Sequence, residues 1–492
     1  MKLSALLDGH DHHVLHGDPD VPVTATITFD AGQVTFGSLY VAVPGHEEGG
    51  PGGISRALER GAVAVLTEDG ALPGSGADLG EVCVVRVADA RAAASLVASR
   101  YYGDPGRAMD VVAVTGTNGK TSVSYMVESA LRLAVGAKVG VIGTSGSRIG
   151  TERIPMPRSV LSTPESPDLH YLLGRMRDRD TSSVVLEATS MGLLQRRLDH
   201  VPVDIGVFTN LTQDHLDDHG TMEHYKNAKL GLFAGLCERA VVNADDPVSA
   251  EIMNLMPGAV TTYGVDSPKA DYRASDLVVD AVGTRFTLHH DGRKYPAAIP
   301  IPGRFSVSNA LATLATCHLL GHELPALVEA LDRMPPTPGR LERFTTARGV
   351  CVIVDYAHSP DSLEKVLATI RGFATGAVTT VFGCGGDRDV TKRPLMGQIA
   401  GHHSDLCVLT SDNPRGEDPE AILDQIVPGL KSTGTPFHRV ADRRAAISRA
   451  LSASRRGDIV LVAGKGSEPH QIVGEHLIPF DDMTVVRELD AL

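Results

Sequence analysis

The sequence contains no run of about 18 consecutive apolar residues and no sustained apolar core near its beginning, MKLSALLDGHDHH. A membrane-spanning helix and an export signal both need such a segment, so the sequence predicts neither. Excess positive charge is missing as well, because the formal net charge at pH 7 is −14. This charge argues against a nucleic-acid backbone or an anionic membrane surface as the main partner, but it allows a local basic pocket for phosphates.

Closely spaced cysteine pairs are also absent. Six cysteines are scattered along the chain without a C-x-x-C arrangement, and several stand inside apolar, strand-like runs. Reduced and mostly structural thiols show this pattern, so we expect a cytoplasmic protein. Internal repeats and low-complexity tracts are missing too.

The length of 492 residues exceeds what one hydrophobic core usually supports, and the apolar content of 42% can supply several cores. The Gly- and Pro-containing stretch 103–107 follows a helical pattern and is typical of a linker. Pro335, Pro336 and Pro338 mark a second boundary before Gly339. We therefore predict three domains, at residues 1–104, 105–338 and 339–492.

Apolar, β-branched runs alternate with helical patterns in all three regions, which predicts an α/β fold. We expect a small N-terminal α/β domain, a central domain with a parallel sheet, and a C-terminal Rossmann-like α/β domain. Residues 270–301 are typical of an antiparallel insertion. The strands expected in the two larger domains are 111–115, 139–142, 183–187, 205–209, 350–354, 378–382, 406–409 and 459–463.

The stretch VVAVTGTNGKTS, residues 111–122, joins a predicted buried strand to a predicted helix through a Gly-rich turn. Backbone N–H groups of such a turn can bind nucleotide phosphates, as in a P-loop. Lys120 can reach the outer phosphates, and Thr121 can hold Mg²⁺. The alternative is an ordinary strand-to-helix turn. The predicted phosphate-binding residues are Gly116, Thr117, Asn118, Gly119, Lys120, Thr121 and Ser122.

Ligands bind beyond the carboxyl ends of parallel strands, and Glu187 stands at such an end. Asp214 and His215 follow another strand. Oxygen and imidazole ligands near phosphates suit Mg²⁺, although each of these residues by itself is equally typical of a solvated loop. Tyr225 and Lys229 are four residues apart on the next helix and therefore share a face.

Polar loops also follow the predicted strands of the third domain. Asp355 and His358 follow one strand, and GCGGDRD at 383–389 follows the next. The stretches DNPR at 412–415 and GKGSE at 464–468 complete the set. Two arginines and a glutamate could surround a small zwitterion there, because Arg binds carboxylates and Glu binds an ammonium. Three unrelated polar loops remain the alternative.

These motifs resemble the Mur ligase family, most closely its MurE branch, over nearly the whole chain. The matching stretches stand in family order and spacing. They are GTNGKTS, TNLTQDHLDDHG, EHYKNAK, GRLERF, VDYAHSPDSLE, FGCGGDRD, TKRPLMG, TSDNPRGEDP and AGKGSE.

The resemblance implies ATP-dependent amide formation through an acyl phosphate, which gives ADP and phosphate. It implies small-molecule substrates, two Mg²⁺ ions and a monomer. Lys120, Glu187, His215 and Lys229 match catalytic positions, and Thr121, Glu187, His215 and Lys229 match the metal shell. Lys229 matches a lysine that carries a CO₂-derived carbamate. Asn309, Arg340, Asp355 and His358 match residues that approach the nucleotide from the central and C-terminal domains.

The resemblance also implies both amide partners. A diaminopimelate-type acceptor is implied by the match of Arg388, Asp412, Asn413, Pro414, Arg415, Gly464 and Glu468. The arginine that ends DNPR corresponds to the one that binds the second carboxylate, which lysine lacks. A UDP-N-acetylmuramoyl-L-alanyl-D-glutamate donor is implied by the match of Ser162, Thr163, Thr189, Gln195 and Arg197.

Several positions depart from the family pattern. Asp30-Ala31-Gly32 replaces Asp-Ser-Arg near the expected uridine, and Gly49-Gly50 replaces Asp-Gly. Met191 and Ser467 stand where the family has histidine, and Ser306 stands where it has asparagine. Two alternatives therefore stay open: a paralogue with the same chemistry on another carboxylate, and a nucleotide-binding regulator without turnover.

Overall fold

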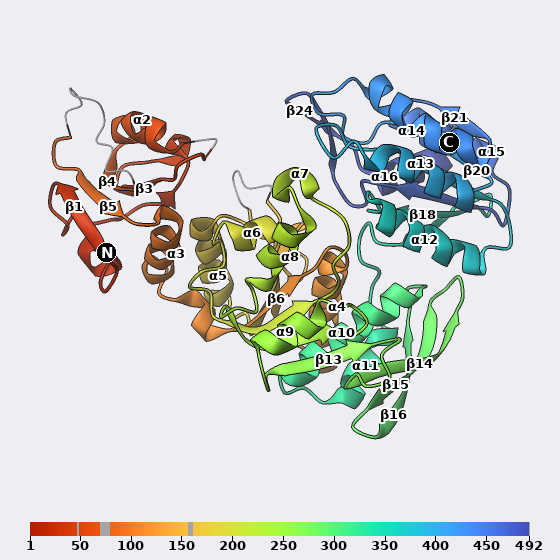
Figure 1. Cartoon of the computed structure of the whole chain (residues 1–492), viewed down its shortest axis with the longest axis horizontal. Coiled ribbons are helices and arrows are strands. Elements are labelled where there is room, and N and C mark those ends of the chain that lie inside the picture. Colours follow the sequence, from red (N-terminus) through yellow and green to blue (C-terminus); the bar gives the residue numbers. More distant parts are fainter. Residues whose placement is uncertain (47–48, 69–78, 156–160, 492) are drawn as a thin grey trace. The chain divides into compact units, whose positions relative to one another are not determined.

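The computed structural model describes residues 1–46, 49–68, 79–155 and 161–491. The chain forms two compact units. The first unit contains residues 1–115, 137–206 and 228–239, and the second contains residues 116–136, 207–227 and 240–492. Figure 1 labels the helices and strands along the chain.

The N-terminal part of the first unit is a five-stranded sheet with the order β1-β5-β4-β3-β2. Strands β2, β3, β4 and β5 pair in parallel, and β1 pairs antiparallel with β5. The elements are α1 Leu3–Leu6, β1 His12–His16, β2 Ile27–Thr28, β3 Ser38–Ala42, α2 Ile54–Glu59, β4 Ala62–Thr67, β5 Cys83–Val87 and α3 Ala90–Tyr101.

Alternate residues of these strands enter two separate cores, because successive side chains of a strand point to opposite faces. Leu39 and Val41 belong to one core together with Ala94 and Val97 of α3. Tyr40 and its neighbours on the other face pack around α2. Both faces of this sheet are therefore covered, as expected for an α/β domain.

The rest of the first unit contains strands in the order β11-β6-β10-β7-β8-β9. β10 pairs in parallel with both β6 and β7, and this register places Glu187 beside Val114. The elements are β6 Asp110–Thr115, β7 Val139–Gly143, β8 Gly146–Ile149, β9 Glu152–Arg153, α5 Ser166–Arg177, β10 Ser183–Glu187, α6 Ser190–Leu194 and the start of β11 Val203–Phe208.

The second unit begins at the Gly-rich turn and contains strands in the order β16-β15-β14-β13-β12. Helix α10 packs against β13 and β14, and α11 packs against β16 (Figure 1). The elements up to residue 338 are α4 Lys120–Val135, α7 Leu216–His219, α8 Met222–Leu230, β12 Cys237–Asn243, α9 Ser249–Leu255, β13 Val260–Gly264, β14 Tyr272–Val279, β15 Thr284–His290, β16 Arg293–Ile299, α10 Arg304–Leu319 and α11 Leu324–Asp332.

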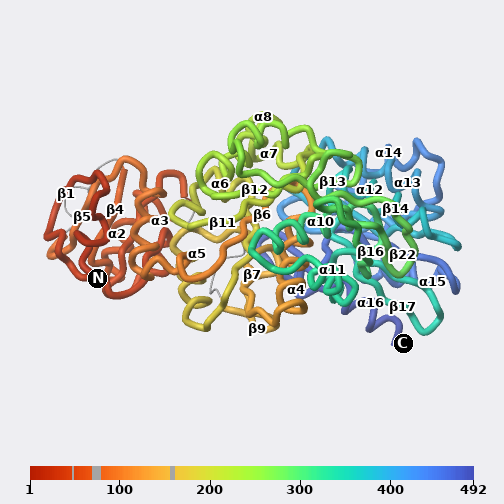
Figure 2. Tube along the Cα trace, turned by 90° about the horizontal axis from the view of Figure 1, so that it is seen from below, coloured from red at the N-terminus to blue at the C-terminus, as the bar shows by residue number. Residues whose placement is uncertain are grey.

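The C-terminal part of the second unit is a six-stranded sheet with the order β17-β18-β22-β19-β20-β21. Strands β18 to β22 pair in parallel, and only β17 is antiparallel to its neighbour. Helices α13 and α14 lie side by side in both views (Figures 1 and 2). The elements are β17 Glu342–Thr345, β18 Cys351–Asp355, α12 Pro360–Phe373, β19 Val378–Phe382, α13 Lys392–His403, β20 Leu406–Leu409, α14 Pro419–Thr433, β21 Phe437–Arg439, α15 Arg443–Ala453, β22 Ile459–Ala463, β23 His470–Val473, β24 His476–Pro479 and α16 Asp482–Asp490.

The predicted α/β fold class is confirmed, and each strand expected in the two larger domains is present within one or two residues of its predicted bounds. Helix α4 begins at Lys120, so the Gly-rich turn leads directly into a helix, as predicted. Residues 270–301 form the expected antiparallel strands. All six cysteines are free. Within the described ranges no helix has the length and hydropathy needed to cross a membrane.

His170 of α5 is almost completely buried in the first unit. Its Nε2 atom lies 3.2 Å from the Ser95 hydroxyl of α3 and 3.4 Å from the Asp199 carbonyl oxygen. Its Nδ1 atom is buried and has no hydrogen-bond partner among the residues that the structure describes. Burial disfavours the charged imidazolium and lowers the pKa of His170 from 6.5 to about 4.

Because His170 is buried in its neutral form, we predict that the folded protein loses stability in acid. Between about pH 6.5 and pH 4 the unfolded chain binds a proton at His170 that the folded chain excludes, so the free energy of unfolding falls by about 3 kcal/mol as the pH drops through that window. The variant His170→Asn should lose less stability between pH 7 and pH 4.5 than the wild type in urea unfolding. The exposed His13→Asn is the matched control, and an unchanged pH dependence in His170→Asn would contradict the assignment.

Candidate active site

The Gly-rich turn after β6 is tightly fixed within the second unit. Gly116 has φ +140°, and a Cβ atom at this position would overlap the Thr209 hydroxyl, so the backbone conformation and the close approach both require glycine. The Lys120 ammonium donates to the carbonyl oxygens of Gly116 and Thr117 at 2.8 and 2.9 Å. The first turn of α4 therefore carries a cation next to backbone N–H groups, which fits a nucleotide phosphate.

Asn118 in this turn contacts two other segments. Its N–H donates to the Asn210 side chain at 3.0 Å, and its side-chain amide donates to Asp361 at 2.9 Å. The Thr212 hydroxyl donates to the same Asp361 oxygen at 3.3 Å. Asp361 lies in the first turn of α12, so the C-terminal domain contributes a carboxylate directly to the Gly-rich turn.

Arg340 and Asp355 form a second connection to the start of α4. The Arg340 guanidinium donates to the Thr121 hydroxyl at 3.2 Å. Asp355 is buried and accepts hydrogen bonds from the N–H groups of Leu341 and Ala357 at 2.7 and 2.8 Å. Burial raises the pKa of this carboxyl, although the nearby Arg340 charge opposes the shift. Asn309 of α10 is also close, because a Cβ atom on Gly119 would lie 2.8 Å from its side-chain oxygen.

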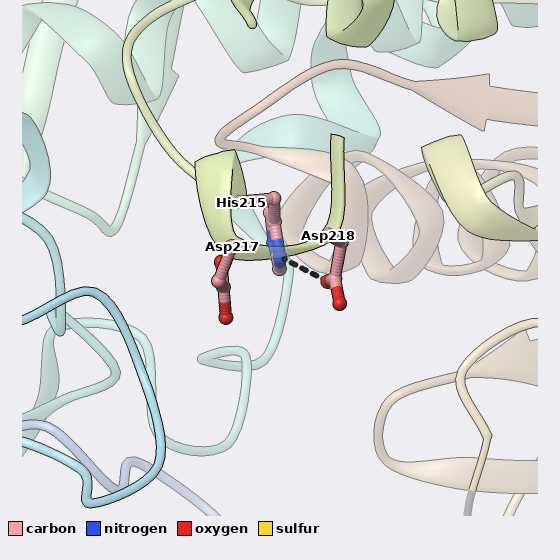
Figure 3. A group of neighbouring side chains, drawn as sticks. All are labelled: His215, Asp217 and Asp218. Atoms are coloured by element: carbon pink, nitrogen blue, oxygen red, sulfur yellow. Dashed lines mark ion pairs between the residues drawn. The ribbon is translucent and has the colours of Figure 1, made fainter. Parts of the chain in front are cut away.

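His215 starts a short acidic turn, with φ +53° (Figure 3). Its Nδ1 atom lies 3.5 Å from an Asp218 oxygen. His215, Asp217 and Asp218 offer ligand atoms that all lie within 4.8 Å of one another, and all three side chains are exposed. This donor set of one imidazole and two carboxylates suits a divalent cation.

Asp214 precedes this turn and lies between two histidines. One of its oxygens is 3.8 Å from His215 Nε2 and 4.0 Å from His358 Nε2. Burial would raise the pKa of Asp214, but the charges of His358, His215 and Lys392 outweigh it and lower that pKa. Burial lowers the pKa of His358, although the neighbouring Asp214 charge opposes the shift. The Lys392 ammonium donates to the His358 carbonyl oxygen at 3.0 Å.

Glu187 is buried at the end of β10 in the first unit. Both of its carboxylate oxygens accept hydrogen bonds from Thr144, one from the N–H at 3.0 Å and one from the hydroxyl at 2.9 Å. The Ser162 hydroxyl lies 2.9 Å from the Thr144 hydroxyl, and the Thr163 hydroxyl donates to the Glu187 carbonyl oxygen at 2.7 Å. Ser162 and Thr163 are therefore neighbours of Glu187.

Arg197 extends the same cluster. It is buried and donates to the Thr163 carbonyl oxygen at 2.8 Å and to Gln195. It also forms an ion pair with Glu165 at 3.0 Å, and Arg91 pairs with the other oxygen of Glu165 at 2.9 Å. Thr189, whose hydroxyl lies 2.9 Å from that of Thr163, completes the set. The first unit thus brings together, in one cluster with Glu187, the five residues that were predicted to bind the muramoyl-dipeptide substrate.

Lys229 lies on α8, in the part of this helix that belongs to the first unit. Only 2% of its surface is exposed. Lys229 is therefore a buried residue of the first unit and not a solvated surface lysine.

The two Gly-rich and Pro-containing loops of the C-terminal domain interlock. Gly386 donates from its N–H to the Asn413 carbonyl oxygen at 2.9 Å, and a Cβ atom on Gly386 would overlap the Pro414 carbonyl oxygen. Arg415 has φ +49°, and its side chain donates to the Gly386 carbonyl oxygen at 2.9 Å. The hairpin of β23 and β24 fixes the Arg415 backbone through hydrogen bonds from Arg415 N to the Ile472 carbonyl and from Gly474 N to the Arg415 carbonyl.

Arg388 and Arg415 both lie next to Gly385. A Cβ atom on Gly385 would be 2.9 Å from Arg415 Nη1 and 3.8 Å from Arg388 Cγ. Arg388 is half exposed and lies 3.6 Å from the Asp217 carboxylate. It lines a cleft of about 580 Å³ together with Leu216, Asp217, Asp387, Asp389, Val390, Thr391 and Glu417.

Glu468 lies at the centre of a polar network. One oxygen accepts from the Asn413 amide at 2.8 Å and from the Lys465 ammonium at 3.0 Å. The other oxygen accepts from the Tyr356 hydroxyl at 3.2 Å. Lys465 is fully buried and also donates to Asn413 Oδ1 at 3.1 Å. Gly464 donates from its N–H to the Asp355 carbonyl oxygen at 3.0 Å, which joins this network to the strand end that carries Asp355.

A fully buried ion pair fixes the loops that begin at Asp412 and Gly464. Arg443 of α15 and Asp482 of α16 are both completely buried and form two hydrogen bonds of 2.8 and 2.7 Å. Arg443 also donates to the Ala463 carbonyl oxygen at 3.0 Å and to the Ser411 carbonyl oxygen at 3.3 Å. These two carbonyls directly precede Gly464 and Asp412, so the ion pair fixes where both loops begin.

The departures in the N-terminal domain are neighbours in the structure. Asp30 and Gly49 form an isolated β-bridge, and the Asp30 carboxylate accepts from the Gly32 N–H at 2.6 Å. Ala31 is buried in the core around Tyr40, whose hydroxyl donates to the Gly50 carbonyl oxygen at 2.8 Å. The replaced positions therefore form one compact patch with a small, apolar character.

Sequence reasoning missed several residues of this site, among them Tyr356, Asp361 and Lys465. Each lies inside a motif whose flanking residues were selected, Tyr356 and Asp361 within VDYAHSPDSLE and Lys465 within AGKGSE. Tyr356 and Lys465 contact Glu468, and Asp361 contacts Asn118. The signal was their position at a strand end or helix start between residues already assigned to the site.

Comparisons with known proteins give the family. The Mur ligase middle domain matches residues 114–317, and the Mur ligase, glutamate ligase domain matches residues 339–466. The chain is 41% identical over 497 residues to a UDP-N-acetylmuramoyl-L-alanyl-D-glutamate–2,6-diaminopimelate ligase of Geobacillus thermodenitrificans. A protein of the same name from Caldanaerobacter subterraneus is 39% identical over 492 residues. Both alignments cover 99% of each chain.

Solved structures agree with this result. A UDP-N-acetylmuramoyl-L-alanyl-D-glutamate–2,6-diaminopimelate ligase has a TM-score of 0.70 and 31% identity, with 100% of this chain and 99% of that chain covered. A MurF ligase from Thermotoga maritima in complex with ADP has a TM-score of 0.65 and 18% identity, covers 95% of this chain and 97% of that chain, and shows the fold alone. Because both domain models match in order and relatives 39% and 41% identical span 99% of the sequence, the chain belongs to the Mur ligase family.

Proposed function

We propose that this Mur ligase uses ATP to join a diaminopimelate-type amino acid to UDP-N-acetylmuramoyl-L-alanyl-D-glutamate. The two relatives reported above are named as ligases of this kind, and each aligns with this chain over 99% of its length. The observation that carries the proposal is the arrangement of Arg388 and Arg415 next to Gly385, in the same domain as the Glu468 network. We propose that the protein acts as a monomer in the cytoplasm, where ATP is available.

The chemistry has two steps. An oxygen of the donor carboxylate attacks the γ-phosphorus of ATP, the bond to the bridging oxygen breaks, and ADP leaves. The amine of the acceptor then attacks the carbonyl carbon of the acyl phosphate, loses a proton and expels phosphate. Catalysis of this kind depends mainly on alignment and on neutralising charge.

The Gly-rich turn and Lys120 would bind the phosphates, and Thr121 would face the first Mg²⁺. Glu187, His215 and the carbamate of Lys229 would hold a second Mg²⁺, and the ions would neutralise phosphate charge. Asn309, Arg340, Asp355 and His358 would bind the nucleotide. Ser162, Thr163, Thr189, Gln195 and Arg197 would bind the muramoyl-dipeptide. The domain boundaries near residues 104 and 338 stay predictions.

The acceptor assignment follows from charge. Diaminopimelate has two carboxylates and two ammonium groups, and Arg binds a carboxylate through a rigid pair of N–H donors. We assign the carboxylates to Arg388 and Arg415 and one ammonium to Glu468. Lysine lacks the second carboxylate and would leave one guanidinium without its partner, which costs affinity.

A second candidate is a ligase with the same chemistry on a different carboxylate donor. The observation that favours it is the patch at Ala31, Gly32 and Gly49, where a hydroxyl and a guanidinium of the family pattern are replaced by small apolar groups. Each lost hydrogen bond to a charged group would weaken donor binding by about 1–3 kcal/mol.

One assay separates the two candidates. Purified protein with ATP and Mg²⁺ is supplied with diaminopimelate or lysine, with and without the UDP-muramoyl-dipeptide, and ADP release is measured. We expect release that needs both the UDP donor and diaminopimelate. A folded protein that binds ATP but is not stimulated by this donor would contradict the main proposal and favour the second. ATP turnover missing with every donor would favour a regulator.

Arg415→Asn tests the acceptor assignment. Asparagine tolerates the left-handed backbone conformation at this position, so the loop is retained while the guanidinium is lost. We expect the KM for diaminopimelate to rise about 10- to 100-fold, because a hydrogen bond to a charged group contributes about 1.5–3 kcal/mol, while ATP binding stays unchanged.

The matched control is Arg444→Asn, which removes an arginine of the same domain that pairs with Glu488 on the surface. It should leave both KM values unchanged. Equal losses of ATP and diaminopimelate binding in Arg415→Asn would contradict the role of Arg415.

Lys229→Ala tests the carbamate. We expect near-complete inactivity that added acetate or formate partly restores, because a short carboxylate can replace the missing oxygen ligand. Lys226→Ala on the same helix is the control, since Lys226 forms ion pairs with Glu223 and Glu251. After addition of ¹³C-bicarbonate, NMR should detect a carbamate carbon in the wild type and in Lys226→Ala. Unchanged activity of Lys229→Ala would remove the carbamate from the mechanism.

A further inference from the structure

Tyr356 lies between Arg340, which we assign to the nucleotide side, and Glu468, which we assign to the acceptor side. It follows Asp355 at the end of β18 and is partly buried. Its ring and its hydroxyl contact different groups.

The ring faces the nucleotide side. The Arg340 guanidinium carbon lies 4.3 Å from the centre of the Tyr356 ring, a distance typical of a cation–π contact. The same guanidinium donates to the Thr121 hydroxyl at the start of α4. The His358 ring lies edge-on to Tyr356, with 4.6 Å between the ring centres. The aromatic ring therefore supports two residues that we assign to the nucleotide.

The hydroxyl faces the acceptor side and donates to one carboxylate oxygen of Glu468 at 3.2 Å. Burial raises the pKa of Tyr356, and the Glu468 charge raises it further, so the phenol keeps its proton at working pH. The other oxygen of Glu468 accepts hydrogen bonds from the Asn413 amide and the Lys465 ammonium. Glu468 is therefore oriented by donors on both of its oxygens.

We infer that Tyr356 is a positioning residue that couples the two substrate sites: its ring orients Arg340 for the nucleotide, and its hydroxyl orients Glu468 for the acceptor amine. This inference rests on the proposed function. A shift of Arg340 on nucleotide binding would move the ring and with it the hydroxyl that holds Glu468. The acceptor site would then be set correctly only when the nucleotide site is.

Two substitutions separate the halves of the side chain. Tyr356→Phe keeps the ring and removes the hydroxyl, so the KM for diaminopimelate should rise about tenfold while the KM for ATP stays unchanged. Tyr356→Leu removes the ring as well, so the KM for ATP should also rise, about fivefold. In a Glu468→Gln background, Tyr356→Phe should raise the KM for diaminopimelate by less than about twofold more, because both substitutions act on the same hydrogen bond.

Tyr263→Phe is the matched control, since the Tyr263 hydroxyl donates to the Phe208 carbonyl oxygen at 3.1 Å, within the core of the same unit. It should leave both KM values unchanged. Equal rises of both KM values in Tyr356→Phe, or no rise for diaminopimelate, would overturn the coupling. A rise in the KM for only one of the two substrates in Tyr356→Leu would also overturn the coupling. If the wild type releases no ADP with diaminopimelate, the proposed function itself fails. If the wild type is active and the variants do not behave as expected, only the coupling fails.

Discussion

Parallel pairing of strands is the constraint on which the arrangement of this Mur ligase depends. The register of β18, β22, β19 and β20 brings their carboxyl ends to one edge of the C-terminal sheet. Asp355, Gly464, Gly383 and Asp412 follow or end these four strands, although more than 100 residues separate the first from the second. The same constraint places Glu187 at the end of β10, beside the strand that leads into the Gly-rich turn. Loops that are distant in sequence therefore meet because their strands are paired.

Three buried cationic side chains hold these loops in place, and each of the three pairs with a carboxylate. Arg443 pairs with Asp482, Lys465 with Glu468, and the fully buried Arg393 with Glu417, which also accepts a hydrogen bond from the Asp387 N–H. Taking a charge out of water is costly, and removing one member of such a pair typically costs about 3–5 kcal/mol. A loop that carries a buried, paired charge thus has few alternative positions. These loops are therefore fixed by ion pairs within the protein itself.

The sequence-based assignment to the Mur ligase family is confirmed by the comparisons, and the α/β class is confirmed by the structure. Strands such as 183–187 and 459–463 could be predicted because long apolar, β-branched runs are interrupted by glycine and polar residues. Lys465 and Tyr356 could not be assigned, because their roles come from contacts with Glu468 and Arg340. The arrangement of Asp30 beside Gly49 was equally hidden, since an isolated β-bridge leaves no periodic signal.

Sequence alone determined the α/β class, the main strands and their order, because local hydrophobic periodicity and turn residues encode strands, helices and Gly-rich turns directly. Motif spacing likewise determined the family. Only the tertiary structure decided which polar groups pair. It placed Tyr356 between Arg340 and Glu468, and it placed the carboxylate of Asp361 on Asn118. These pairings depend on strand register and on helix packing between segments far apart in the chain, and such distances exist only after the chain has folded.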